Sequence, residues 1–288
     1  MSKTKSISYQ VRGILSSKVR IGLSRKEVKR RNGGKSPYIH SFDTYNTYAD
    51  KATAFGEWVK AVYGERDVTQ MRRYVKPYLE SLTARDLSPF SIRTYAQALA
   101  KLYGCESTDF KFDFAPRTRS VIKRSRNAVK NYDPKHYRHI TGFIDATGLR
   151  RHEVLAIKRN EIYFRDGVLY VFVRQGKGGK QREVPILVED EATVLTARDR
   201  VTGDDEKLFK KDEIPTRVPC HAHRAKFAAR RYKKLARPIE DVPRNERYVC
   251  RKDMKGLVLD KASMQQVSKL LGHNRIGIIA SNYSYQMG

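Results

Sequence analysis

The hydrophobic pattern of the chain changes after residue 104. Before that point apolar residues recur every three to four positions, which is the period of a helix with one buried face. Residues 105–117 lose this period and include Pro116. We therefore expect a small all-helical domain over 42–104, followed by a linker over 105–131. Its helices are predicted over residues 45–63, 68–83 and 88–103.

The second half of the chain mixes helices with strands. Residues 168–174 form an apolar, β-branched run, and residues 183–187 are predicted to pair with it across a glycine-rich turn at 176–180. A length of 288 residues fits about two domains, and 40% hydrophobic residues suffice for two cores. An α+β domain is therefore expected over 132–288. Its helices are predicted over residues 135–147, 150–158, 190–199, 219–236, 262–271 and 276–285.

The chain carries 59 Lys and Arg residues against 31 Asp and Glu residues, a formal net charge of +28. Residues 1–131 hold 27 basic and 11 acidic residues, a net +16, and the remainder holds 32 and 20, a net +12. Two basic folded halves disfavour a charge-neutral metabolic enzyme and indicate a long polyanion, with nucleic acid as the first candidate. A generally cationic surface, or one that meets anionic lipid, is the weaker alternative because no amphipathic membrane-surface helix stands out.

Two segments concentrate this charge. Residues 1–41 hold eleven basic residues and one acidic residue, Glu27, and are expected to form a basic arm that contains a short helix. In the linker, basic residues follow one another with no acid among them, which favours contacts with a DNA backbone over a solvated helix face. The linker residues expected to bind DNA are Arg117, Arg119, Lys123, Arg124, Arg126 and Lys130.

No stretch approaches the roughly 18 apolar residues that span a bilayer, and the first ten residues lack the apolar core of a signal peptide. We therefore expect a cytoplasmic protein with no membrane partner. The cysteines form no CxxC pair, so no disulfide framework or familiar zinc finger is indicated. A zinc set of Cys220, His221, His223 and Cys250 is disfavoured because adjacent residues on a helix point in different directions.

Three short motifs hold residue types that suit phosphate chemistry. In the first two, an arginine lies one helical turn from a glutamate or a histidine, and each pair alone is typical of an ordinary surface contact. In the third, a Gly-His helix end is followed ten residues later by a tyrosine. Their order and spacing make the combination specific. The motifs are Thr147–Glu153 with Arg150, His221–Arg224, and Leu270–His273 with Tyr283.

These motifs resemble those of the tyrosine recombinase or phage integrase family, whose catalytic domain carries T-G-L-R-x-x-E, a hairpin lysine, H-x-x-R, L-G-H and a late tyrosine. The resemblance covers residues 132–288, and the helical domain before them is similar to the family's core-binding domain in composition and position. It implies that the two domains form a clamp around duplex DNA. It also implies no cofactor, and a homotetramer on two specific DNA sites that assembles from monomers or dimers.

The resemblance implies roles for the arginines, the histidines and the glutamate. Arg150 and Arg224 match the two arginines that hold the scissile phosphate. His221 matches the partner of Arg224, and His273 matches the histidine of L-G-H. Glu153 matches the acidic residue that supports the active-site arginine.

The lysine and the nucleophile each have an alternative. Lys177 matches the first lysine of the family's G-K-G-x-K-x-R hairpin, with Lys180 as the fallback. Tyr283 matches the nucleophile because Ala280-Ser281-Asn282-Tyr283 is similar to the A-S-x-Y of some phage integrases. Its spacing from His273 is one residue longer than the commonest one, so Tyr285 stays open as an alternative.

Physical chemistry agrees with these roles. A tyrosine, with an ordinary pKa of about 10, needs a cationic site and a nearby base to attack phosphorus. Arginines stay charged and hold the non-bridging oxygens through bidentate forks, while histidines exchange protons and a lysine protonates the departing 5′ oxygen. The 3′-phosphotyrosine conserves the bond energy, so religation needs no nucleotide.

A site-specific recombinase or integrase of a mobile genetic element is therefore the expected function. A type IB topoisomerase that relaxes supercoils as a monomer would use the same chemistry, but the basic arm and separate helical domain favour site binding. A DNA-binding regulator without catalysis is the third hypothesis, and the presence of all catalytic residue types disfavours it. The interval from Arg224 to His273 is longer than in the family, which places an insertion near 243–259. A small hairpin is predicted there, with strands at 247–250 and 257–259.

Overall fold

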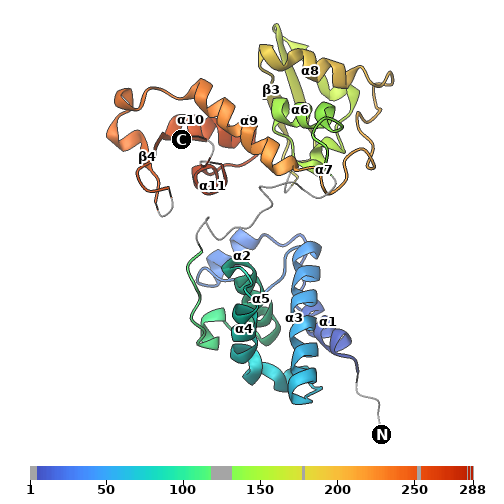
Figure 1. The fold of residues 1–288 in the computed structure, drawn as a ribbon, viewed down its shortest axis with the longest axis vertical. Helices are drawn as coiled ribbons and strands as arrows, with labels where there is room; N and C mark the ends of the chain where they lie inside the picture. Colours follow the sequence, from blue (N-terminus) through green and yellow to red (C-terminus); the bar gives the residue numbers. More distant parts are fainter. Residues whose placement is uncertain are drawn as a thin grey trace. The chain divides into compact units, whose positions relative to one another are not determined.

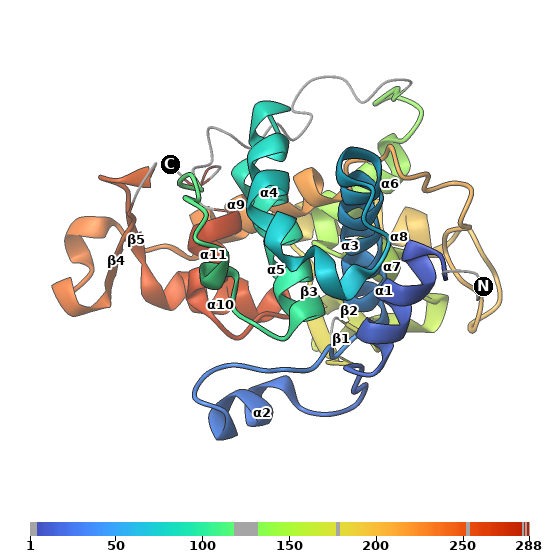
Figure 2. The same ribbon diagram turned by 90° about the horizontal axis from the view of Figure 1, so that it is seen from below.

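The computed structural model describes residues 5–117, 132–176, 179–251, 254–283, 285 and 287. The chain divides into two compact units, Met1–Ile122 and Lys123–Gly288, and each has its own apolar core. The first unit is helical, and the second combines helices with two small antiparallel sheets (Figures 1 and 2). The expected fold class, mainly helical with small hairpin sheets, is confirmed. No helix in the described ranges is long and apolar enough to cross a membrane.

The first unit packs its helices around one core. Its elements are α1 (Ile7–Ser16), α2 (Arg25–Arg31), α3 (Phe42–Tyr63), η1 (Val68–Tyr74), α4 (Val75–Ala84), α5 (Pro89–Tyr103) and η2 (Ser107–Phe110). α3 contacts α1 and α5, and α4 packs against α5. Ser88 Oγ accepts a hydrogen bond from the Ser91 N–H (3.2 Å) and caps α5, in which Pro89 is the first residue. These capping signals explain why the predicted helix over 88–103 agrees closely with α5.

Two parts of this unit differ from the expected arrangement. Ile7, Val11 and Leu15 of α1 follow one another at four-residue spacing and are buried in the core. This part of the predicted arm 1–41 therefore packs within the helical unit. The segment predicted as the second helix forms η1 and then α4. Pro77 lies in the first turn of α4. In the interior of one long helix it would lose a backbone hydrogen bond and clash with the preceding turn, which explains why the helix begins just before it.

The second unit builds its core from α6, α8, α9 and a three-stranded sheet. Its elements are α6 (Arg138–Thr147), α7 (Arg151–Val154), η3 (Arg159–Glu161), β1 (Ile162–Arg165), β2 (Val168–Val173), β3 (Arg182–Pro185), α8 (Val188–Arg198), α9 (Cys220–Leu235), η4 (Ile239–Asp241), η5 (Arg244–Glu246), β4 (Arg247–Val249), β5 (Val258–Asp260), α10 (Lys261–Leu270) and α11 (Ile276–Asn282). β2 pairs antiparallel with β1 and β3, and β4 pairs with β5. Both predicted hairpins are therefore confirmed.

Strand β1 was not predicted. Only Ile162 among its four residues is buried, so the alternation that identifies a strand is missing. Asp166 and Gly167 have positive φ values of 50° and 74° and connect β1 to β2, with Arg165 paired to Val168. An Asp-Gly pair between two strands is typical of a tight hairpin turn, and this dipeptide is the signal that would have located β1.

Gly148 joins α6 closely to α9. It ends α6 in the left-handed region, with φ 64°, which a side chain would strain. A Cβ atom at this position would lie 2.4 Å from Phe227 Cδ1. Glycine is therefore required here both for its φ angle and for the close approach of α9, and this approach places the Gly148 carbonyl against Arg224.

Candidate active site

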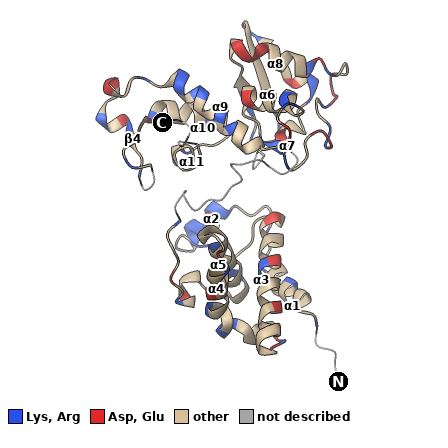
Figure 3. Ribbon diagram, in the orientation of Figure 1, with Lys and Arg blue, Asp and Glu red and all other residues tan. Residues whose placement is uncertain are grey.

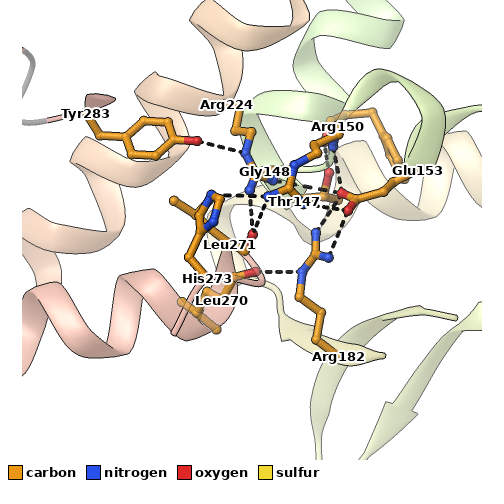
Figure 4. Close-up of polar contacts among 11 residues, drawn as sticks. Thr147, Gly148, Arg150, Glu153, Arg182, Arg224, Leu270, Leu271, His273 and Tyr283 are labelled. Carbon is orange, nitrogen blue, oxygen red and sulfur yellow. Dashed lines mark hydrogen bonds and ion pairs between the residues drawn. The ribbon is translucent and has the colours of Figure 1, made fainter. Parts of the chain in front are cut away.

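Side chains from distant parts of the sequence meet at one end of α9 in the second unit (Figure 4). Arg150 and His273 are 123 residues apart in sequence, and Arg150 Nη2 lies 3.1 Å from His273 Nε2. All but one of the residues in this cluster were predicted from motifs. The cluster consists of Arg150 and Glu153 at α7, Arg182 on β3, Arg224 on α9, His273 before α11 and Tyr283 after it.

Glu153 is the anionic centre of the cluster, and its side chain is fully buried. Its carboxylate accepts two hydrogen bonds from Arg150, through the backbone N–H (2.8 Å) and Nη1 (2.8 Å), and two from Arg182, through Nη1 (3.0 Å) and Nη2 (2.7 Å). Burial alone would raise the pKa of Glu153, but hydrogen bonds and charge from Arg182, and then from Arg150, lower it to about 2. Glu153 is therefore ionised at neutral pH and holds both guanidinium groups in place.

Arg224 brings a buried positive charge to the hydroxyl of Tyr283. The residue as a whole is 1% exposed, and its Nε donates to Tyr283 Oη at 3.2 Å. Its two Nη atoms donate to the carbonyl oxygens of Gly148 and Leu271. Burial lowers the pKa of Arg224 to about 10, which leaves the guanidinium protonated at neutral pH. The Tyr283 hydroxyl therefore accepts from a charged donor, which stabilises a phenolate.

Arg150 is the more accessible of these two arginines. Its side chain is 17% exposed, against 2% for the side chain of Arg224. Arg150 Nη2 donates to Leu271 O at 3.2 Å, so one carbonyl accepts from both arginines. This shared acceptor sets the two guanidinium groups side by side.

Two histidine rings flank Tyr283. The ring centroid of His221 lies 5.7 Å from that of Tyr283, and the ring centroid of His273 lies 6.4 Å from it. His223 instead lies 2.9 Å from the Asp145 carboxylate through Nδ1, which supports a structural role. In the described part of the chain, no group of three or more His, Cys, Asp or Glu side chains is arranged to hold a metal ion.

The two candidate tyrosines differ in their surroundings. Tyr283 is 2% exposed and its hydroxyl contacts Arg224, whereas Tyr285 is 39% exposed. Tyr283 is therefore the more buried of the two, and its hydroxyl lies on the buried guanidinium of Arg224.

The candidate lysines and linker residues are only partly described. The Asn274 side-chain amide is oriented so that its nitrogen donates to His273 O (3.1 Å). In this orientation its oxygen accepts a hydrogen bond from Lys180 Nζ (3.3 Å). The fallback lysine therefore lies beside the His273 loop. Arg117 is exposed in the first unit, with its guanidinium 5.7 Å from the Phe90 ring. The residues outside the described ranges are Lys177, Arg119, Lys123, Arg124, Arg126 and Lys130.

Arg182 was not predicted to belong to the site. Its side chain is 8% exposed, and besides its fork on Glu153 it donates through Nε to Leu270 O at 2.8 Å. A Cβ atom on Gly272 would lie 3.1 Å from Arg182 Nη1, so the glycine of the L-G-H motif leaves room for this guanidinium. The signal that could have found Arg182 is its place as the final arginine of the G-K-G-x-K-x-R hairpin motif.

The cluster carries an excess of positive charge. Arg150, Arg182 and Arg224 face one carboxylate, which leaves two positive charges unbalanced among these described residues. A phosphodiester fits this environment, because attack on phosphorus builds negative charge on the non-bridging oxygens.

Three solved structures with a similar fold are complexes of recombinases with DNA. The XerH site-specific recombinase in its post-cleavage complex with a palindromic difH substrate has a TM-score of 0.51 at 16% identity, over 97% of this chain and 91% of that chain. The XerH pre-cleavage complex with difH has a TM-score of 0.50 at 16% identity, over 97% and 93%. The Tn1549 transposon integrase with a circular intermediate DNA has a TM-score of 0.50 at 13% identity, over 95% and 94%. At such identities the likeness concerns the fold.

Sequence comparison identifies the family. A comparison with curated proteins gives no match. The model of the phage integrase family matches residues 118–286, which is more than half of the chain and includes every residue of the cluster. The chain therefore belongs to the phage integrase family, the DNA-cleaving and rejoining tyrosine recombinases.

Proposed function

We propose that this protein is the site-specific recombinase of a mobile genetic element and that Tyr283 is its nucleophile. The observation that carries this proposal is the hydrogen bond from Arg224 Nε to Tyr283 Oη at 3.2 Å, in a cluster with an excess of positive charge. The hydroxyl that must become an anion thus already contacts a buried cation.

The proposed first step forms a bond between Tyr283 Oη and the scissile phosphorus. The phenolic proton passes to His221 or His273, whose rings flank the tyrosine. Arg150 and Arg224 stabilise the charge on the non-bridging oxygens. The bond from phosphorus to the 5′ oxygen breaks, and Lys177 or Lys180 donates a proton to that oxygen. In the second step the 5′ hydroxyl of another strand gives its proton to that lysine and bonds to the phosphorus, while the bond from phosphorus to Tyr283 Oη breaks and Oη takes its proton back from the histidine.

The proposed partner is duplex DNA that carries the recombination sites. Both halves of the chain have a net positive charge, +16 and +12, which supports a clamp that holds DNA with two domains. We extend the proposal to four protomers on two sites, acting in the cytoplasm on prokaryotic or viral-element DNA.

A suicide substrate tests this function directly. Duplexes that span the joined ends of the encoding element, each nicked at a different position, lose a short strand after cleavage and so trap the intermediate. We expect a covalent adduct that resists denaturation, forms without added nucleotide, and carries the DNA on Tyr283 when its peptides are analysed by mass spectrometry. DNA binding without an adduct would indicate a silent regulator. Relaxation of supercoiled DNA that lacks the site, with no recombinant product, would indicate a topoisomerase.

Arg182 is proposed as a positioning residue that acts through Glu153 on Arg150. Arg182→Lys keeps the charge but loses the two-bond fork to the buried carboxylate. A hydrogen bond to a charged group contributes about 1.5–3 kcal/mol. We therefore expect the single-turnover rate of adduct formation to fall by about 10- to 100-fold. DNA affinity, measured by fluorescence anisotropy, should stay within about twofold.

A matched control lies in the same sheet. Arg165 also forms a fork on a glutamate, Glu183, through Nη1 (3.0 Å) and Nη2 (2.8 Å), but it is exposed and its fork is on Glu183, which lies outside the cluster. Arg165→Lys should leave the adduct rate unchanged. In a background of Arg150→Ala, Arg182→Lys should add little further loss, because its effect passes through Arg150. Additive losses in the double variant would contradict the positioning role.

A further inference from the structure

The first unit contains a cavity of about 330 Å³ that the proposed chemistry does not use. It is lined by α2, by the loop that follows α2, by the start of α3, and by α5 and the residues after it. Figure 3 shows Lys and Arg along α2. The cationic residues that line the cavity are Arg25, Lys29, Lys35 and Lys101.

Positive charge in this cavity is not balanced. Glu106 is the one carboxylate among the described lining residues, and it pairs with Lys35 at 3.6 Å. Three cationic side chains remain, and they repel one another. Burial lowers the pKa of Lys101, and the charges of Lys18 and Arg25 lower it further. A bound anion would remove this repulsion.

The cavity wall is held in place by two half-buried lysines. Lys101 Nζ donates to Ser36 O at 2.6 Å, and Lys18 Nζ donates to Leu102 O at 3.0 Å. The N–H of Ile39, a buried residue, donates to Lys18 O at 2.9 Å. Among the described residues Ser36 O is the one hydrogen-bond partner of Lys101 Nζ, which leaves two N–H donors for a ligand. The site is therefore formed before any ligand arrives.

We infer that this cavity binds a phosphate group of the DNA backbone. Three unbalanced cations and free ammonium donors select a compact oxyanion, and Lys and Arg are the usual partners of DNA phosphates. The identity of the source rests on the proposed function, since inorganic phosphate offers the same chemistry. DNA is favoured because Lys26 and Arg30 extend the positive surface of α2 outside the cavity.

The test compares two pairs of substitutions in α2. Arg25→Gln with Lys29→Gln removes two cations that line the cavity. Lys26→Gln with Arg30→Gln removes two exposed cations of the same helix that do not line it. Both pairs change the net charge equally, and thermal unfolding in chloride checks that both variants fold.

The first measurement uses inorganic phosphate alone. At matched ionic strength, phosphate should raise the unfolding temperature of the unchanged protein above that in chloride, because a ligand that binds the native state stabilises it. The control pair should keep the full rise, and the cavity pair should show a smaller one that comes only from phosphate at the cluster around Arg150. The inference is overturned if phosphate gives no rise, or if both pairs lose it equally.

The second measurement identifies the source. For duplex DNA, the slope of log affinity against log salt should become shallower by about 0.9 for each phosphate that the cavity pair no longer neutralises, beyond any change in the control pair. Equal slopes in the two pairs would overturn DNA as the source. Both measurements leave out the chemistry of Tyr283, so a failure of the suicide-substrate assay would count against the proposed function and not against this cavity.

Discussion

Replacing Tyr283 with Phe is expected to abolish the covalent protein–DNA adduct on the suicide substrate. The change removes the oxygen that we propose attacks phosphorus, and Tyr283 is the one residue of the cluster with a hydroxyl on its side chain. The ring itself stays, so the core around this 2% exposed residue keeps its packing. DNA affinity should therefore stay close to that of the unchanged protein, which separates a loss of chemistry from a loss of folding.

Tyr285→Phe is the matched control for this result. Tyr285 lies two residues further along and is 39% exposed, so loss of its hydroxyl should change the adduct rate by no more than about twofold. The measurement is the yield of adduct against time for both variants. An adduct that survives Tyr283→Phe but disappears in Tyr285→Phe would reverse the assignment of the nucleophile.

The sequence pointed to most residues of this cluster because they lie in short local motifs. Arg150 and Glu153 occur within one helical turn, and His221 and Arg224 within another, so their proximity follows from the helical repeat. That these pairs also meet Tyr283 follows from tertiary packing. From the sequence, this contact was expected only because the order and spacing of the motifs resemble those of a known family.

Arg182 shows where the sequence was insufficient. The hairpin tip carries several cations between β2 and β3, and which of them turns inward depends on the strand register, not on the order of residues. Arg182 pairs with Val173, and this register directs its guanidinium to the buried Glu153. In the sequence, a buried arginine on a strand next to a lysine-rich turn looks the same as an exposed arginine there.

The fold was predictable where local signals were strong. Ser88, Pro89 and Gly104 mark both ends of α5, whereas the single buried residue of β1 gave no alternation to detect. α1 was assigned to an arm because charge dominates residues 1–41. Its apolar residues lie four apart on one face, and burial of that face outweighs the composition of the segment.

Arg150→Ala is expected to lower the single-turnover rate of adduct formation by about 10²- to 10³-fold, the usual effect of removing one donor that stabilises transition-state charge. Glu153 keeps its two hydrogen bonds from Arg182, so the buried carboxylate is still paired and the unit still folds. DNA affinity should change little, because Arg150 supplies one of many cations that hold the DNA backbone.

The neighbouring Arg151→Ala provides the control for this change. It removes an arginine from the same short helix, and Arg151 belongs to none of the contacts that join Arg150, Glu153 and Arg182. Its adduct rate should therefore match that of the unchanged protein. The adduct rate of Arg150→Lys should lie between those of Arg150→Ala and Arg151→Ala. A lysine keeps the charge but cannot contact Glu153, Leu271 and a phosphate with one planar group. If Arg150→Ala instead weakens DNA binding as strongly as it slows cleavage, Arg150 acts on the bound DNA in general and not on the transition state.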